Sequence, residues 1–214
     1  MDRERRAAGR DLDTAIRQIT GRPARPDERD RFDAYLEQLL LWNRTHRLTG
    51  LHGPADIVRK LFIDSLLYLP LLPAARPLRV ADIGSGAGIP GVPLRIIDPG
   101  ISLTLLDSRR KAVSFLSALK RSLRLEDVNV HQARAETYLA ERPEEKGAYG
   151  ALVTRAVALD ESRVASLREY LSAGGLIIAS GPPGGQDERG MAKGGRVVEV
   201  PSQERGLKRH FLIY

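Results

Sequence analysis

From residue 78 onward, short apolar segments alternate with amphipathic helical segments, and this alternation restricts the fold more than any other feature. The first apolar segment, LRVADIG (78–84), is followed by the helical pattern PGVPLRIID (90–98). The same order repeats as far as residue 181. Short strands separated by helices predict a parallel sheet with helices on both faces. The chain is therefore expected to be an α/β protein.

The later segments complete this pattern. Further strands are expected at 101–107, 128–132, 149–158 and 174–181. Further helices are expected at 108–123, 135–141 and 160–171. The helix at 108–123 is expected to face inward through Val113, Leu116, Leu119 and Leu123.

The last part of the chain predicts two strands that pair antiparallel to each other. A loop rich in Gly and Pro, PPGGQDERGMAKGG, follows Gly181. RVVEVP (196–201) and KRHFLIY (208–214) then leave no room for a helix between them. We therefore expect an antiparallel hairpin at the sheet edge, which completes a mostly parallel seven-stranded sheet.

The first 70 residues carry helical patterns only. A short helix is expected at 11–20, followed by a linker at 21–29. The next helix should begin at Asp27 as its N-cap and end near Gly50. Its apolar stripe comprises Phe32, Tyr35, Leu36, Leu39 and Leu40. A third helix should run from Pro54 to Pro70, and its inward face comprises Ile57, Leu61, Ser65 and Tyr68. We expect a helical extension at 1–70 and a sheet domain at 71–214.

Composition restricts the compartment and the partners. The chain has no cysteine, which excludes disulfides, thiolate metal sites and cysteine nucleophiles, and which suits a reducing cytoplasm. No apolar stretch follows the basic start MDRERRAAGR, so this segment is not expected to be a secretory signal. Prolines interrupt the longest apolar run, SLLYLPLLPAA, which is too short to span a membrane. We expect a cytoplasmic monomer with no membrane contact. A net charge of +7 favours an anionic partner, nucleic acid before a membrane surface.

A glycine-rich segment, VADIGSGAGIPGVPLRI, joins the first strand to its helix at residues 80–96. Glycines at 84, 86 and 88 would let the backbone approach a ligand, and the free N–H groups of the next helical turn would face it. Gly84-x-Gly86-x-Gly88 after Asp82 is typical of S-adenosylmethionine-dependent methyltransferases. Gly86-x-Gly88-x-x-Gly91 matches the dinucleotide fingerprint instead. A tight turn with close helix packing is a purely structural alternative.

Two acids and the final hairpin favour the methyltransferase interpretation. Asp82 could orient the loop or recognise the methionine end of the cofactor. Asp107 closes the second strand, where a carboxylate accepts hydrogen bonds from ribose hydroxyls in both families. A reversed strand at the sheet edge is similar to methyltransferases, whereas dinucleotide-binding folds usually end in parallel strands. An NAD-linked oxidoreductase remains the alternative.

Several longer motifs resemble one family, the RsmG (GidB) 16S ribosomal RNA (guanine-N7)-methyltransferases. They are LLLWNRTHRLTG, KLFIDSLL, DIGSGAGIPGVPL, LTLLDSRRKAVSFL, VTRAVA and KRHFLIY. The resemblance implies a Rossmann-like class I methyltransferase fold, S-adenosylmethionine as cofactor, S-adenosylhomocysteine as product, and 16S rRNA or the 30S particle as substrate. It also implies cofactor contacts at Gly84, Ile89, Ala135, Glu136 and Arg155.

The chemistry of guanine N7 demands little acid–base catalysis. N7 has an exposed lone pair and no proton to lose, so the task is to place it in line with the methyl group. Asn43, Asp64 and Arg155 are candidates for shaping the guanine site, and no general base is expected. For Asn43 and Asp64, a helix cap or turn contact is an equal alternative, and for Arg155 a structural ion pair is the alternative.

Three positions depart from the family pattern. Arg47 replaces an asparagine, Leu61 a histidine, and Ser180 the lysine of a Lys-Gly pair; all three are expected near the active face. A non-catalytic ribosome- or RNA-associated relic of the family is therefore a further alternative.

Charged clusters are the expected RNA contacts, and no metal site is expected. The candidate phosphate contacts are residues 108–111, Lys120, Arg121, Arg124 and residues 204–210. His46, His52, His131 and His210 lack the spacing of metal ligands.

Overall fold

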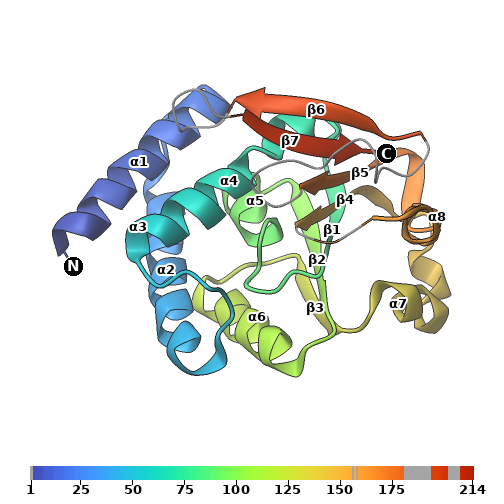
Figure 1. The fold of residues 1–214 in the computed structure, drawn as a ribbon, viewed down its shortest axis with the longest axis horizontal. Coiled ribbons are helices and arrows are strands. Elements are labelled where there is room, and N and C mark those ends of the chain that lie inside the picture. The colour runs from blue at the N-terminus through green and yellow to red at the C-terminus, as the bar shows by residue number, and fades with distance from the viewer. Residues whose placement is uncertain (1, 156, 158, 181–193, 202–207) are drawn as a thin grey trace.

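A seven-stranded sheet in the order β3-β2-β1-β4-β5-β7-β6 forms the centre of the computed structural model, with helices on both sides (Figure 1). The structure describes residues 2–155, 157, 159–180, 194–201 and 208–214. The strands are β1 (Leu78–Ile83), β2 (Ile101–Asp107), β3 (Val128–Gln132), β4 (Tyr149–Arg155), β5 (Leu171–Ser180), β6 (Arg196–Pro201) and β7 (Lys208–Ile213). The mostly parallel seven-stranded α/β sheet expected from the sequence is therefore confirmed.

The strand order reverses between β1 and β4. The chain steps outward from β1 to β2 and β3, and then returns to pair β4 against the other side of β1. All of these strands are parallel, so their carboxyl ends meet at one edge. In open α/β sheets this reversal point is where ligands bind.

The final hairpin differs from the prediction in one respect. β7 runs antiparallel to β5 and to β6, as expected for RVVEVP and KRHFLIY. However, β7 is inserted between β5 and β6, so only β6 lies at the edge. The loop expected after Gly181 lies mostly outside the described residues, as do residues 202–207.

Alternate side chains of the strands enter two separate cores. Val80 and Val153 belong to the core on the side of the N-terminal helices. Ala81 and Leu152 belong to the opposite core, together with buried residues of the last two helices, α7 (Ala135–Glu141) and α8 (Glu161–Arg168). This alternation follows from the period-two geometry of a strand that is covered on both faces.

The N-terminal helices begin elsewhere than predicted, and α1 is longer. α1 extends over Asp2–Thr20, where Ala8 continues toward the N-terminus the buried stripe of Leu12, Ala15 and Ile16. α2 (Pro26–His46) has Arg25, not Asp27, as its N-cap, with Pro26 in the first turn. It ends at Arg47 in the left-handed conformation (φ 49°), before the predicted stop at Gly50.

A buried carboxylate ties the linker between α1 and α2 to the sheet domain. Glu28 is fully buried and accepts hydrogen bonds from both terminal nitrogens of Arg22, at 2.9 and 2.6 Å, and from the backbone of Arg25 at 2.7 Å. Arg22 also donates to the carbonyl oxygen of Ile97, at the end of α5 (Gly91–Ile97). This contact places the extension directly against the first crossover helix.

The third predicted helix is divided into short pieces. It comprises α3 (Pro54–Ile57), a π-helical turn (Val58–Ile63) and α4 (Asp64–Leu66), and a 3-10 turn (Leu69–Leu71) contains Pro70. The predicted inward face is confirmed, because Ile57, Leu61, Ser65 and Tyr68 are all buried.

The inward face of α6 (Arg110–Ser122) differs slightly from the prediction. Leu116, Leu119 and Leu123 are buried as expected, but Val113 is only half-buried and Phe115 takes its place in the core. None of the helices among the described residues is both long and apolar enough to cross a membrane.

Candidate active site

The glycine loop between β1 and α5 lies at the point where the strand order reverses. Gly84, Gly86 and Gly88 all adopt positive φ angles, of 74°, 56° and 88°. A Cβ on Gly88 would lie 2.8 Å from the Tyr35 hydroxyl and 2.9 Å from Val92, so this position is closely packed against protein. A Cβ on Gly86 would approach only the guanidinium of Arg109, at 3.2 Å. The loop is thus closely packed on one side and open on the side of Gly86.

A tyrosine from α2 supports the packed side of this loop. The hydroxyl of Tyr35 is fully buried and donates a hydrogen bond to the carbonyl oxygen of Ala87, between Gly86 and Gly88. Its ring packs on Phe62, with the ring centroids 4.6 Å apart. The sequence indicated only that Tyr35 belongs to an apolar stripe, because its long-range partner is invisible in a local pattern.

Asp82 holds the beginning of α5 against the loop. It is fully buried, and its Oδ2 accepts a hydrogen bond of 2.8 Å from the backbone N–H of Gly91. A Cβ on Gly91 would lie 2.8 Å from the same oxygen, which explains the glycine. Burial raises the pKa of Asp82 to about 7, against the opposing effect of this hydrogen bond. Asp82 therefore bonds the backbone at the start of α5, and its role in orienting the loop stays a prediction.

Asp107 closes β2 beside the loop, and both of its carboxylate oxygens are engaged. Oδ2 accepts the backbone N–H of Gly86 at 2.8 Å, and Oδ1 accepts that of Arg109 at 2.8 Å. The guanidinium of Arg109 also donates to both oxygens at 3.1 Å. Burial acts to raise the pKa of Asp107, but the hydrogen bonds from Arg109 and Gly86 outweigh it and hold the pKa below its ordinary value.

One expectation about the loop is wrong. The N–H groups of the next helical turn were expected to face the ligand, but they are bonded inside the protein: Gly91 donates to Asp82, and Val92 donates to the carbonyl of Gly88. The reason is that α5 begins beneath the loop, close to β1. The loop therefore offers a ligand close backbone approach at Gly86 rather than a row of free donors.

Two residues that the resemblance implies as cofactor contacts follow the third strand. Ala135 and Glu136 begin α7, directly after β3. The Ala135 carbonyl accepts a hydrogen bond from the Tyr170 hydroxyl, and the exposed Glu136 forms an ion pair of 3.3 Å with Arg163 of α8. Ile89 is buried in the core next to the loop.

Two of the predicted substrate-positioning residues come together, and a third basic residue joins them. Arg155, at the end of β4, lies 3.4 Å from Asp64 of α4 (Nη2 to Oδ2). Arg209 of β7 lies 3.2 Å from the same Oδ2. Burial lowers the pKa of Arg155 from its ordinary value, with the carboxylate of Asp64 opposing this. The sequence suggested residues 204–210 as surface phosphate contacts, and it missed that Arg209 is buried in this cluster.

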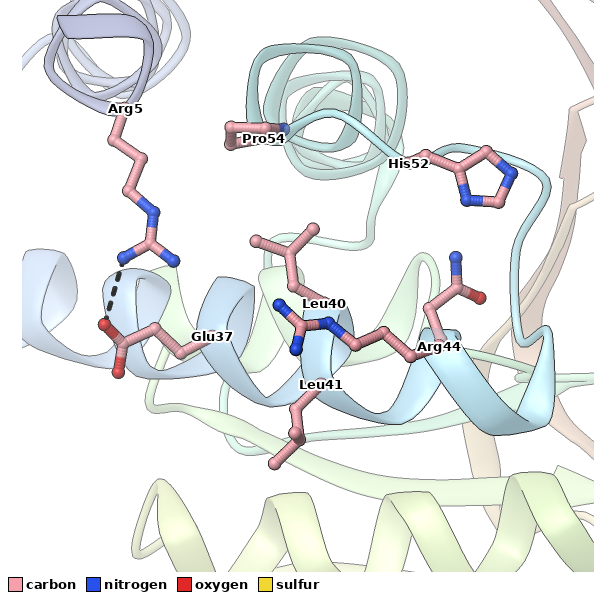
Figure 2. Close-up of a pocket in the computed structure, with 8 residues that line it drawn as sticks. Arg5, Glu37, Leu40, Leu41, Arg44, His52 and Pro54 are labelled. Carbon is pink, nitrogen blue, oxygen red and sulfur yellow. Dashed lines mark hydrogen bonds and ion pairs between the residues drawn. The ribbon is translucent and has the colours of Figure 1, made fainter. Parts of the chain in front are cut away.

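Asn43 lies apart from this cluster. Its amide nitrogen donates to the Leu51 carbonyl and its oxygen accepts the Thr49 N–H, both at 2.9 Å. It borders a pocket between α1, α2 and the start of α3, where Arg5, Arg44 and His52 lie around Leu40 and Leu41 (Figure 2). The turn-stabilising alternative therefore describes the contacts that Asn43 makes.

The three departures from the family pattern occupy different environments. Arg47 is the exposed left-handed C-cap of α2, a conformation that asparagine tolerates better. Leu61 is buried in the hydrophobic core. Only Ser180 lies at the expected edge, at the end of β5, where its hydroxyl is 2.6 Å from that of Tyr68. Ser180 thus lies where the expectation put it, and the expectation that Arg47 and Leu61 also lie near the active face stays a prediction.

The predicted basic clusters are only partly exposed. Arg110, Lys111, Arg121 and Arg124 are exposed and Lys120 is half-buried, whereas Arg109 is held by Asp107 and residues 204–207 lie outside the described residues. The described residues contain no group of three or more His, Asp or Glu side chains that could hold a metal ion.

The sheet order, the antiparallel β7 and the glycine loop after β1 together define a Rossmann-like fold of the methyltransferase type. A solved structure of an S-adenosylmethionine-dependent methyltransferase from Aquifex aeolicus shares this fold, with a TM-score of 0.56 at 15% identity over 78% of this chain and 95% of that one. The loop fits such a cofactor, because Gly86 carries no side chain and the side-chain atom nearest to a Cβ built there, at 3.2 Å, belongs to the half-exposed guanidinium of Arg109.

Comparison with protein families identifies the particular family. Residues 28–190 match the model of GidB, rRNA small subunit methyltransferase G. "Ribosomal RNA small subunit methyltransferase G" of Clostridium kluyveri is 32% identical over 94% of this chain and 87% of the relative. The protein of the same name from Anaeromyxobacter sp. is 36% identical, over 87% of this chain and 86% of the relative. The chain belongs to the GidB family and is an S-adenosylmethionine-dependent methyltransferase.

Proposed function

We propose that this enzyme transfers the methyl group of S-adenosylmethionine to N7 of a guanosine in small-subunit (16S) ribosomal RNA in the cytoplasm. The observation that carries the proposal is the glycine loop at the strand-order reversal, with Asp82, Asp107 and Arg155 around it. The relatives' names support the substrate class.

The cofactor, when bound, supplies a methyl group that is already activated on a sulfonium. In the proposed arrangement, the Gly86 backbone gives it room, and Asp107 accepts hydrogen bonds from its ribose hydroxyls. The guanidinium of Arg109 now occupies both oxygens of Asp107, so it has to move aside first. Its side chain is 50% exposed, which leaves it room to do so. Ile89, Ala135 and Glu136 complete the cofactor contacts.

The acceptor needs orientation rather than deprotonation, because N7 carries no proton. Arg155 ends β4, the strand next to the glycine loop, with Asp64 on its guanidinium. These two residues are proposed to position the guanine. Asn43 is proposed to act indirectly, by holding the loop at residues 49–51 through both ends of its amide. Well-oriented reactants can lower a barrier by roughly 7–11 kcal/mol.

Methyl transfer to purified 16S rRNA and to 30S particles tests the proposal. The particles should come from a strain without the gene, and mass spectrometry should find 7-methylguanosine in the products only with enzyme and S-adenosylmethionine. Calorimetry should show binding of S-adenosylmethionine and none of NAD. If the cofactor binds but neither RNA substrate is methylated, the non-catalytic alternative replaces this proposal.

A further inference from the structure

A buried cluster of charged side chains lies at the carboxyl edge of the sheet, beside the proposed reaction site. Arg155 ends β4, and Arg209 is the second residue of β7. Ser180, the last residue of β5, pairs with Phe211, so Arg209 lies just beyond the carboxyl end of β5. Asp64, the first residue of α4, is within 3.4 Å of one guanidinium and 3.2 Å of the other.

The charges that the described residues bring to this cluster do not balance. Among those residues, two guanidiniums face one carboxylate, which leaves one positive charge in excess, and the side chains of Arg155, Arg209 and Asp64 are only 18%, 11% and 15% exposed. Tyr68, which also lies beside Asp64 and Arg155, stays neutral because burial raises its pKa. An uncompensated cation held away from water is costly, so the site favours an anion.

Unused donors indicate the same preference. Among the described residues, Nη1 of Arg155 and Nε of Arg209 are buried without a hydrogen-bond partner, and Nη2 of Arg209 has only its ion pair with Asp64. Buried guanidinium N–H groups in native proteins are normally satisfied. Two arginine side chains offer planar donor pairs that match the oxygens of a phosphate.

We propose that Arg155 and Arg209 form a subsite for a backbone phosphate of the RNA acceptor, with Asp64 holding both guanidiniums in position. This deepens the proposed function and rests on it, since the acceptor is taken to be RNA. The carboxylate of the cofactor is a poorer occupant. Arg155 lies one strand from the cofactor loop, but Arg209 lies on β7, three strands from β1 in the sheet order and roughly 14 Å away at the usual strand spacing, so the cofactor cannot engage both arginines as easily as an RNA phosphate can.

A binding assay with inorganic phosphate tests the subsite without RNA. At constant ionic strength, replacing chloride with millimolar phosphate should raise the melting temperature of the wild-type enzyme. Arg209→Met should abolish that rise. Lys146→Met is the matched control, because it also removes one cation but lies at the opposite edge of the sheet in an exposed pair with Glu169. A rise that persists in Arg209→Met overturns the proposal.

Equilibrium binding then assigns the phosphate to the RNA. Arg209→Met should weaken binding of a 16S rRNA fragment about tenfold, the effect of one lost charge-assisted contact, while calorimetry gives an unchanged affinity for S-adenosylmethionine. Weaker cofactor binding with unchanged RNA binding would show that the cluster serves the cofactor. A large loss of thermal stability without any phosphate response in the wild type would show a purely structural cluster. Either result overturns the proposal.

A variant with the opposite expected effect separates a loss of phosphate binding from a loss of folding. Asp64→Asn keeps a side-chain oxygen that can hold the two guanidiniums but removes the negative charge that repels an anion, so phosphate should bind this variant several-fold more tightly than the wild type. A weaker response in Asp64→Asn would contradict the subsite. If the wild type binds RNA and phosphate as described but methylates no RNA, the proposed function fails while the subsite stands.

Discussion

The glycines of the loop are required for different reasons at neighbouring positions. Gly86 and Gly88 both adopt positive φ angles, which cost a residue with a side chain about 1–2 kcal/mol. Beyond this shared cost, a side chain at Gly88 would collide with Tyr35 and Val92, whereas one at Gly86 would meet only a movable arginine. Backbone strain and ligand access can therefore be separated by mutation.

Replacing these two glycines with alanine should produce two distinct phenotypes. Gly86→Ala should lower the melting temperature by roughly 2–8 °C, because it pays only the backbone cost, yet weaken S-adenosylmethionine binding at least about tenfold. Gly88→Ala should lose more than about 10 °C, because it adds close collisions inside the core. Calorimetry and thermal unfolding measure both effects. An unchanged affinity for S-adenosylmethionine in Gly86→Ala would contradict the interpretation that the cofactor approaches the backbone at Gly86.

The buried carboxylate of Asp82 should make stability depend on pH. Its pKa is about 7 in the folded protein, above the ordinary value of 3.8, so the folded state binds this proton more tightly than the unfolded state does. The resulting stability is complete below pH 3.8 and is lost as the pH rises to 7.

Asp82→Asn removes the loss of stability that follows deprotonation of Asp82, and it keeps a side-chain oxygen that can accept the Gly91 N–H. The stability of the variant relative to the wild type should therefore rise by about 2 kcal/mol, or roughly 4–8 °C, between pH 5 and pH 8. Thermal unfolding of both proteins in the same buffers measures the difference, in which the other titrating groups cancel. A difference that stays constant with pH would show that Asp82 titrates normally.

Among the elements, α2 has a role that its sequence pattern did not indicate. Its apolar stripe predicts a helix packed on a core, and Tyr35 in that stripe reaches the glycine loop. α2 thus contributes directly to the shape of the glycine loop, the proposed cofactor site, although it ends at His46, well before β1 begins at Leu78.

Tyr35→Phe tests this coupling between α2 and the loop. Loss of the hydroxyl leaves the Ala87 carbonyl unsatisfied, which should cost about 1–3 kcal/mol and weaken cofactor binding several-fold. Tyr149→Phe is the matched control, since its buried hydroxyl bonds Thr104 at 3.1 Å in the opposite core. The control should lose stability and keep cofactor affinity. Equal cofactor affinity in both variants would contradict a supporting role for Tyr35.

At the scale of the whole molecule, the charge of +7 predicts how the enzyme responds to salt. Each phosphate contact releases counterions, so three contacts should weaken RNA binding roughly 40-fold between 50 and 200 mM salt. S-Adenosylmethionine binding should change little over the same range. Fluorescence anisotropy with labelled RNA measures the slope. Binding to RNA that does not change with salt would contradict phosphate contacts.

The sequence by itself determined the class of fold and the position of the glycine loop. Strand and helix periods depend only on neighbouring residues, so the sequence shows the alternation after residue 78 directly. The glycines at 84, 86 and 88 indicate positions where the backbone adopts a positive φ. The predicted ends of the helices were less accurate. α2 begins with a proline in its first turn, after Arg25 as N-cap, and it ends at an arginine in the left-handed conformation, whereas the sequence predicted Asp27 and Gly50 at these ends.

Only the tertiary structure decided which side chains meet. Asp64, Arg155 and Arg209 come from an N-terminal helix, the fourth strand and the last strand, and their shared carboxylate oxygen became visible only in the folded chain. The same holds for Tyr35 on the Ala87 carbonyl and for Asp107 on the backbone N–H of Gly86. Long-range contacts depend on packing across the whole sheet, and no local spacing in the sequence records that packing.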